Sequence, residues 1–145
     1  NQIRMDLAKK LGADLVLGKD DDVIESILSH TNGKGVDNSC EFSGSPTALS
    51  NAIHSTRMGG YVNILSVYGN SLTEVPMNDV VFRYLHVKGI NGRKMWTTWD
   101  KMHELLSANK IDINTLVTHR INYQEYAKGI ELALTGDCGK IVMDF

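Results

Sequence analysis

Apolar positions along the chain switch repeatedly between helical and strand spacing. Helical spacing occurs within 3–11, 23–28, 46–58, 97–109 and 126–134, and strand-like runs occur at 14–17, 36–42, 61–64, 86–90, 116–121 and 139–145. Helices that alternate with strands at short, regular intervals are typical of a parallel sheet joined by helical crossovers. The pattern therefore predicts an α/β fold with a parallel sheet.

Several predicted helices carry terminal signals. Ser45 can accept a hydrogen bond from an unpaired amide at a helix start, and Pro46 has no amide to leave unpaired. Thr97, with Asp100 three residues later, resembles a capping box. Gly136 suits a helix end, because glycine adopts positive φ without a Cβ clash. By the same reasoning Gly59 and Gly60 are expected to end the helix that begins at Pro46.

The stretch from Gly59 to Gly69 is the first candidate for a binding site. A short β-prone run is followed by a loop of small residues that begins at Leu65, Ser66 and Val67. Ligands of parallel α/β sheets bind outside the carboxyl ends of the strands, where the loops part. These three residues are therefore where a cofactor is expected. The alternative is a buried strand that turns into an ordinary loop.

Composition and charge narrow the classes of partner. The chain has 145 residues, 42% hydrophobic and 22% charged, which suffices for one domain with a core. A net charge of -2 argues against a nucleic acid or an anionic membrane as partner. No apolar run approaches the roughly 18 residues that span a bilayer, and no signal peptide is recognised at the start. Two lone cysteines favour a reducing, cytoplasmic location.

Motifs in a fixed order carry a family resemblance. They are Arg4 with Leu-Ala-Lys-Lys-Leu-Gly-Ala-Asp, Gly-Val-Asp…Glu-Phe-Ser-Gly-Ser-Pro within 35–46, Met-Gly-Gly-Tyr-Val at 58–62, Lys-Gly-Ile-Asn-Gly-Arg-Lys-Met with Trp99, Ile-Asp…Val-Thr-His-Arg, and Gly-Asp-Cys-Gly-Lys-Ile-Val. Together they resemble the medium-chain, zinc-dependent alcohol dehydrogenase superfamily. Gly-Arg-Lys-Met followed by Trp99 resembles its L-threonine 3-dehydrogenase branch, and the sorbitol and butanediol dehydrogenases are close competitors.

The resemblance implies that this chain is the C-terminal part of such an enzyme. Residues 1–115 would be a partial NAD-binding (Rossmann) domain, and 116–145 a segment returning to the catalytic domain. Rossmann sheets are ordered 3-2-1-4-5-6, so the first two strands would be missing. The chain has no Gly-x-Gly-x-x-Gly turn for the pyrophosphate. Unpaired strand edges invite association, and we expect a homo-oligomer.

The resemblance also assigns coenzyme contacts. Arg4 matches the residue that contacts the adenosine end of NAD. The loop that contacts the nicotinamide is matched by Leu65, Ser66 and Val67. A second contact to the nicotinamide is matched by Ile90 and Asn91. Ser43, Gly44 and Lys140 are weaker candidates. Ser66 stands where relatives often carry glycine, and Asn91 where threonine dehydrogenases often carry tyrosine. The resemblance assigns no catalytic residue to this chain, because the front half of such enzymes carries the proton relay. No metal ligand is assigned, because the histidines and cysteines lack ligand spacing.

The implied reaction is oxidation of a secondary alcohol, with L-threonine at C3 as the leading substrate. NAD would accept the hydride, and a zinc ion held elsewhere in the intact enzyme would polarise the alkoxide. The chain alone is expected to be inactive. Two other classes remain: a non-catalytic nucleotide-binding or assembly module, and a Rossmann-like methyltransferase, whose glycine-rich first loop is also missing.

Overall fold

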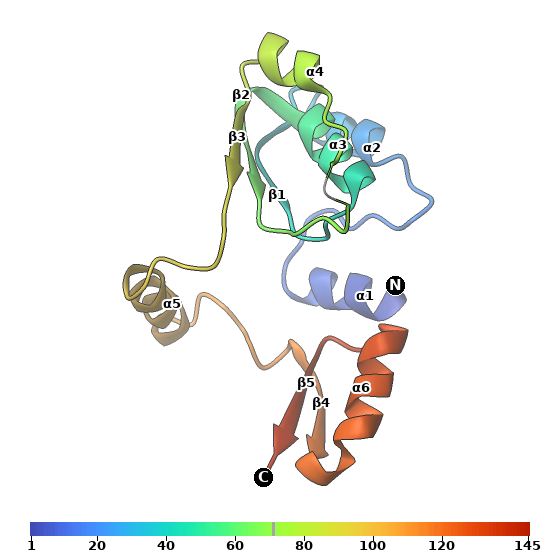
Figure 1. Cartoon of the computed structure of the whole chain (residues 1–145), viewed down its shortest axis with the longest axis vertical. Helices are drawn as coiled ribbons and strands as arrows, with labels where there is room; N and C mark the ends of the chain where they lie inside the picture. The colour runs from blue at the N-terminus through green and yellow to red at the C-terminus, as the bar shows by residue number, and fades with distance from the viewer. Residues whose placement is uncertain (71) are drawn as a thin grey trace. The chain divides into compact units, whose positions relative to one another are not determined.

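The computed structural model describes residues 1–70 and 72–145. The chain forms two compact units, one of residues 21–93 and the other of residues 1–20 together with 94–145 (Figure 1). Each unit has its own parallel sheet, and each is described by itself.

The unit of residues 21–93 is an α/β unit around a three-stranded sheet. Its elements are α2 (Val23–His30), β1 (Val36–Glu41), α3 (Pro46–Ser55), β2 (Thr56–Ile64), α4 (Met77–Phe82) and β3 (His86–Gly89). The strand order is β1-β2-β3, and both pairings are parallel. The predicted parallel α/β fold is confirmed.

The core of this unit lies between α3 and the sheet. Ile53 of α3 and Val62 of β2 are fully buried, and Leu49 and Leu85 join them. Helix α3 contacts both β1 and β2, and α2 packs against α3 (Figure 1). The amphipathic pattern of α3 is thus explained by one apolar face buried on the sheet.

Helix α3 begins where the sequence predicts. The Ser45 side chain accepts a hydrogen bond from the Ala48 amide at 3.4 Å, and Pro46 occupies the first turn. The predicted end was wrong, because α3 stops at Ser55 and the two glycines lie inside β2.

The glycine pair belongs to an irregularity in the strand pairing. Val36 pairs with Thr56, but Asn38 pairs with Tyr61, so residues 57–60 lie opposite a single residue of β1. Gly59 has a φ of +68°, and a Cβ on Gly60 would lie 3.0 Å from the Asp37 carbonyl oxygen. Positive φ and close approach are the uses of glycine at a bulge as well as at a helix end. The sequence signal therefore could not tell the two apart.

The other unit joins the start of the chain to its end. Its elements are α1 (Gln2–Lys10), α5 (Thr97–Ser107), β4 (Val117–Asn122), a 3-10 turn (Tyr123–Glu125), α6 (Tyr126–Thr135) and β5 (Lys140–Asp144). Strands β4 and β5 pair in parallel. Asn1 donates hydrogen bonds to the Gly136 carbonyl at 3.1 Å and to Asp137 Oδ1 at 3.2 Å. Gly136 adopts the left-handed conformation after α6, as predicted.

Two local expectations were wrong. Residues 14–17 form no strand, because no strand among the described residues pairs with them and β1 is an edge of its sheet. Thr97 does not cap a helix: it is the first residue of α5, Trp96 holds the cap position, and no side chain caps this end.

The predicted division into domains 1–115 and 116–145 refers to an intact enzyme and stays a prediction.

Among the described residues, no helix combines the length and the apolar character needed to cross a bilayer.

Truncation of Ile53 tests whether α3 holds the 21–93 unit together. Ile53→Ala removes a fully buried side chain, and the lost contacts and the cavity should lower the free energy of unfolding by about 2–5 kcal/mol. Val81→Ala, on the exposed face of α4, is the matched control and should change it by less than about 0.5 kcal/mol. Urea denaturation measures both, and equal effects would contradict this account of the core.

Candidate functional site

The carboxyl ends of the three parallel strands open at the same edge of the sheet. The Leu65 amide donates to the Glu41 carbonyl at 3.0 Å, and the Ile90 amide donates to the Ile64 carbonyl at 2.8 Å. These bonds continue the strand pairing beyond β2 and β3, so the loops that begin at Leu65 and Ile90 start side by side. In Figure 1, α4 lies at the opposite, amino ends of β2 and β3. We call the loop starts after β1, β2 and β3 the carboxyl edge.

Five of the six predicted coenzyme residues lie at the carboxyl edge. Val67 is 91% exposed and Leu65 40% exposed, Asn91 is exposed, and Ser66 and Ile90 are partly buried. Apolar side chains beside a polar amide can pack against a flat, partly polar ring. The edge is therefore compatible with the predicted nicotinamide contact.

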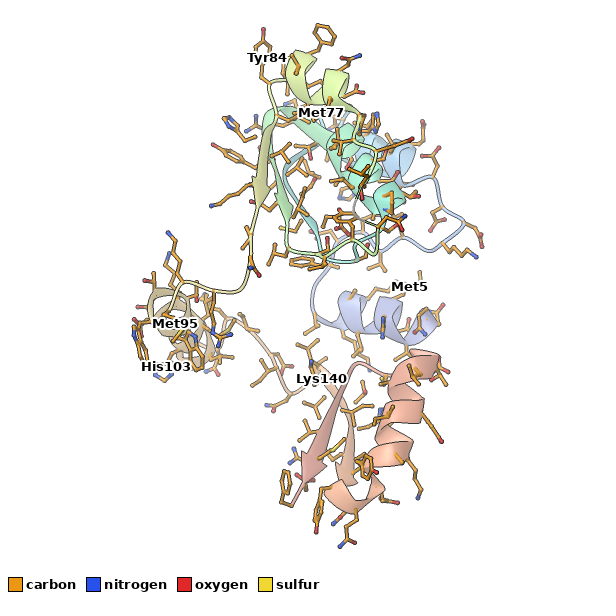
Figure 2. All side chains as sticks on the ribbon, viewed as in Figure 1. Met5, Met77, Tyr84, Met95, His103 and Lys140 are labelled. Carbon is orange, nitrogen blue, oxygen red and sulfur yellow. The ribbon has the colours of Figure 1, made fainter. Side chains whose placement is uncertain are left out.

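Arg4, the sixth predicted residue, belongs to the other unit. Its Nε donates to the Cys138 carbonyl at 3.3 Å, which fixes the side chain beside the turn that follows α6. Lys140, a weaker candidate, is exposed at the start of β5 (Figure 2), and its amide donates to the Leu116 carbonyl at 2.7 Å.

The most connected residue of the carboxyl edge is one that sequence reasoning missed. Glu41 ends β1 and is only 3% exposed. Its Oε1 accepts from the Ser43 amide and hydroxyl, both at 2.6 Å, and from the Gly44 amide at 3.1 Å. Its Oε2 accepts from the Tyr68 hydroxyl at 2.9 Å and from the Ser66 hydroxyl. One carboxylate thus joins the loop after β1 to the loop after β2.

These contacts set the charge of the site. Burial alone would raise the pKa of Glu41, but hydrogen bonds from Ser43, Ser66 and Tyr68 outweigh it and lower the pKa from 4.5 to about 2. Burial raises the pKa of the Tyr68 phenol above 10.0; the Ser66 hydrogen bond opposes this, and Glu41 adds to it. Glu41 is therefore ionised at neutral pH, and Tyr68 is a neutral donor.

Backbone contact also joins the two loops. Gly44 has a φ of +72°, and a Cβ there would lie 2.5 Å from the Val67 carbonyl oxygen. Glu41 and Gly44 both stand in the Glu-Phe-Ser-Gly run. A charged residue that ends a strand-like run, followed by Ser and Gly, is the signal that could have found this network.

Within residues 1–70 and 72–145, no group of three or more His, Cys, Asp or Glu side chains is placed to hold a metal ion. Cys138 is buried, whereas Cys40 is exposed.

Comparison with known proteins decides the family. A family profile described as "Zinc-binding dehydrogenase" matches residues 1–108. The chain belongs to the zinc-binding dehydrogenase family. This confirms the resemblance on which the assignment of site residues depends.

Two similar proteins match nearly the whole chain. An L-threonine 3-dehydrogenase of Bacillus licheniformis is 40% identical over 144 residues, which are 99% of this chain and 42% of the relative. The crystal structure of 2R,3R-butanediol dehydrogenase from Bacillus subtilis superimposes with a TM-score of 0.86 at 30% identity, over 100% of this chain and 42% of that one.

The similarity to a third protein shows only that the fold is shared. A protein described as a short chain alcohol dehydrogenase from E. coli CFT073, solved with NADH, has a TM-score of 0.83 at 18% identity, over 100% of this chain and 42% of that chain. The chain thus spans less than half the length of each of these three proteins.

Acid titration tests the charge of Glu41. Because its pKa is lowered in the folded state, ionised Glu41 stabilises the fold above about pH 4.5, and this stabilisation is lost as the pH falls toward about 2. The difference in unfolding free energy between the wild type and Glu41→Gln should therefore shrink across that interval in urea denaturation. Val81→Ala, which alters no titratable group, is the control, and its difference from the wild type should not change with pH. A difference independent of pH would contradict the assignment.

Proposed function

We propose that this chain provides the coenzyme-binding part of an NAD-dependent zinc alcohol dehydrogenase. The reaction is oxidation of a secondary alcohol, in which NAD, when bound, accepts the hydride. The observation that carries the proposal is the pairing of the loop starts after β2 and β3 at one edge of a parallel sheet in a member of this family. The choice of NAD rests on the resemblance of Arg4, Leu65 and Ile90 to coenzyme contacts of this family.

In this proposal the carboxyl edge positions the nicotinamide. Leu65 and Val67 present apolar surface to the ring, and Ser66, Ile90 and Asn91 lie beside them. Backbone amides and carbonyls in the two loops orient the carboxamide, which selects the face of the ring that takes the hydride. These residues orient the ring and keep water from it; none of them transfers a proton.

Arg4 is proposed to contact the adenosine end of NAD. Its guanidinium carries five N–H donors, and the bond to the Cys138 carbonyl uses the one on Nε. The planar group suits stacking on a base or a contact to ribose hydroxyls.

L-Threonine is the leading substrate, because the relatives named L-threonine 3-dehydrogenase reach 40% identity. A diol is the second candidate, supported by the 30% identity to butanediol dehydrogenase; sorbitol is a further substrate to test. A non-catalytic nucleotide-binding or assembly module remains the alternative of another class.

A homo-oligomer is proposed because β3 is an edge strand whose four residues are all exposed.

A cytoplasmic location is proposed because both cysteines are free thiols.

Titration of the 145-residue chain with NAD tests the role of the missing turn. Without Gly-x-Gly-x-x-Gly the chain offers no cradle for the pyrophosphate, so calorimetry should show no binding or a Kd in the millimolar range. Micromolar binding would contradict the proposal that the phosphate site lies outside this chain.

Turnover tests the activity and the substrate. The full product of the coding region that contains this chain is assayed for NADH formation with L-threonine, 2,3-butanediol and sorbitol. We expect zinc-dependent turnover, fastest with L-threonine. A product that binds zinc but reduces NAD with no alcohol would overturn the enzyme assignment in favour of the binding module.

A further inference from the structure

We propose that Glu41 is a positioning residue for the nicotinamide: its carboxylate holds the loop of Ser66 and Tyr68 in register with the turn of Ser43 and Gly44. The inference rests on the proposed function, because it takes that loop as the nicotinamide contact. Glu41 lies beneath the loop, 97% of its surface removed from solvent, and so acts through its neighbours and not by touching the coenzyme.

The donors around Glu41 come from both loops. Oε1 faces two backbone amides and the Ser43 hydroxyl, and Oε2 faces the Ser66 and Tyr68 hydroxyls. None of the ion pairs among residues 1–70 and 72–145 includes Glu41. Its charge is therefore stabilised by five hydrogen-bond donors and not by a cation. Removing the charge therefore weakens the hydrogen bonds that the carboxylate accepts from both loops.

The charge also fixes the direction of the hydroxyl groups. A carboxylate only accepts hydrogen bonds, so the protons of Ser66 and Tyr68 point toward Glu41. A glutamine side chain at this position could keep its oxygen toward the backbone N–H groups of Ser43 and Gly44, because a backbone N–H can only donate. Its NH2 group would then face the two hydroxyls, which would have to turn their protons away. Glu41→Gln therefore reverses the hydrogen bonds of the nicotinamide loop. It keeps the bonds of the 43–44 turn to Oε1 and loses the longer one from the Gly44 amide to Oε2, at 3.2 Å.

The loop after β1 and the loop after β2 are in such close contact that one cannot move without displacing the other. The Cα of Gly44 lies so close to the Val67 carbonyl that a Cβ would reach within 2.5 Å of the oxygen. Hydrogen bonds to a charged group are stronger than neutral ones, and their loss leaves donors unpaired. We therefore expect a displaced loop at Ser66, Val67 and Tyr68 in Glu41→Gln, with β1 and β2 still paired.

Steady-state kinetics of the full enzyme with two ligands tests the proposal. In Glu41→Gln the KM for NAD should rise about tenfold. The inhibition constant of ADP-ribose, which is NAD without nicotinamide, should stay within about twofold, because Glu41 acts only on the nicotinamide loop. A general loss of folded enzyme lowers the apparent kcat and moves neither constant. The split between NAD and ADP-ribose therefore distinguishes positioning from stability.

Asp37→Asn is the matched control, because it removes a carboxylate of the same strand that is 76% exposed and paired with Arg57. Both constants should equal those of the wild type. If Glu41→Gln does not fold, Tyr68→Phe removes one donor to the carboxylate and should raise the KM for NAD in the same direction, by less.

Two results would overturn the proposal: an unchanged KM for NAD in folded Glu41→Gln, or equal weakening of NAD and ADP-ribose. A wild-type enzyme without turnover overturns the proposed function itself, and with it the role of Glu41. The two failures are thus distinguishable by the behaviour of the wild type.

Discussion

The parallel pairing of β2 with β1 on one side and β3 on the other is the constraint on which the site depends. Parallel strands all end at one edge, and the last backbone hydrogen bonds, from Leu65 to Glu41 and from Ile90 to Ile64, bring the loop starts together. The burial of Ile53 and Val62 holds α3 on this sheet. An antiparallel β3 would place Ile90 at the other end of the sheet, away from Leu65.

The carboxyl edge carries a buried negative charge, which is costly unless it is satisfied. Glu41 accepts hydrogen bonds from two serines, one tyrosine and two backbone amides, and these outweigh the cost of burial enough to lower its pKa to about 2. The same bonds join the loops after β1 and β2. A single charged group therefore couples the stability of this edge to the geometry that the edge offers a ligand.

Sequence reasoning predicted the features that local chemistry determines and missed those that depend on distant partners. Ser45 with Pro46 and Gly136 mark helix ends through contacts within a few residues, and both were found. Gly59 and Gly60 were misread because a bulge and a helix end both favour glycine, and the difference lies in the pairing with Asp37. Residues 14–17 have strand character but no partner strand. Glu41 was missed because its donors at Ser66 and Tyr68 are 25 and 27 residues away.

Hydrogen–deuterium exchange of the full enzyme, with and without NADH, tests most directly whether the carboxyl edge holds the nicotinamide. The account predicts slower exchange on NADH binding in the two segments 64–68 and 89–91, which include Leu65 and Ile90, and no change in α4 at the opposite end of the sheet. Protection confined to other segments, with both loops exchanging as in the free enzyme, would contradict it.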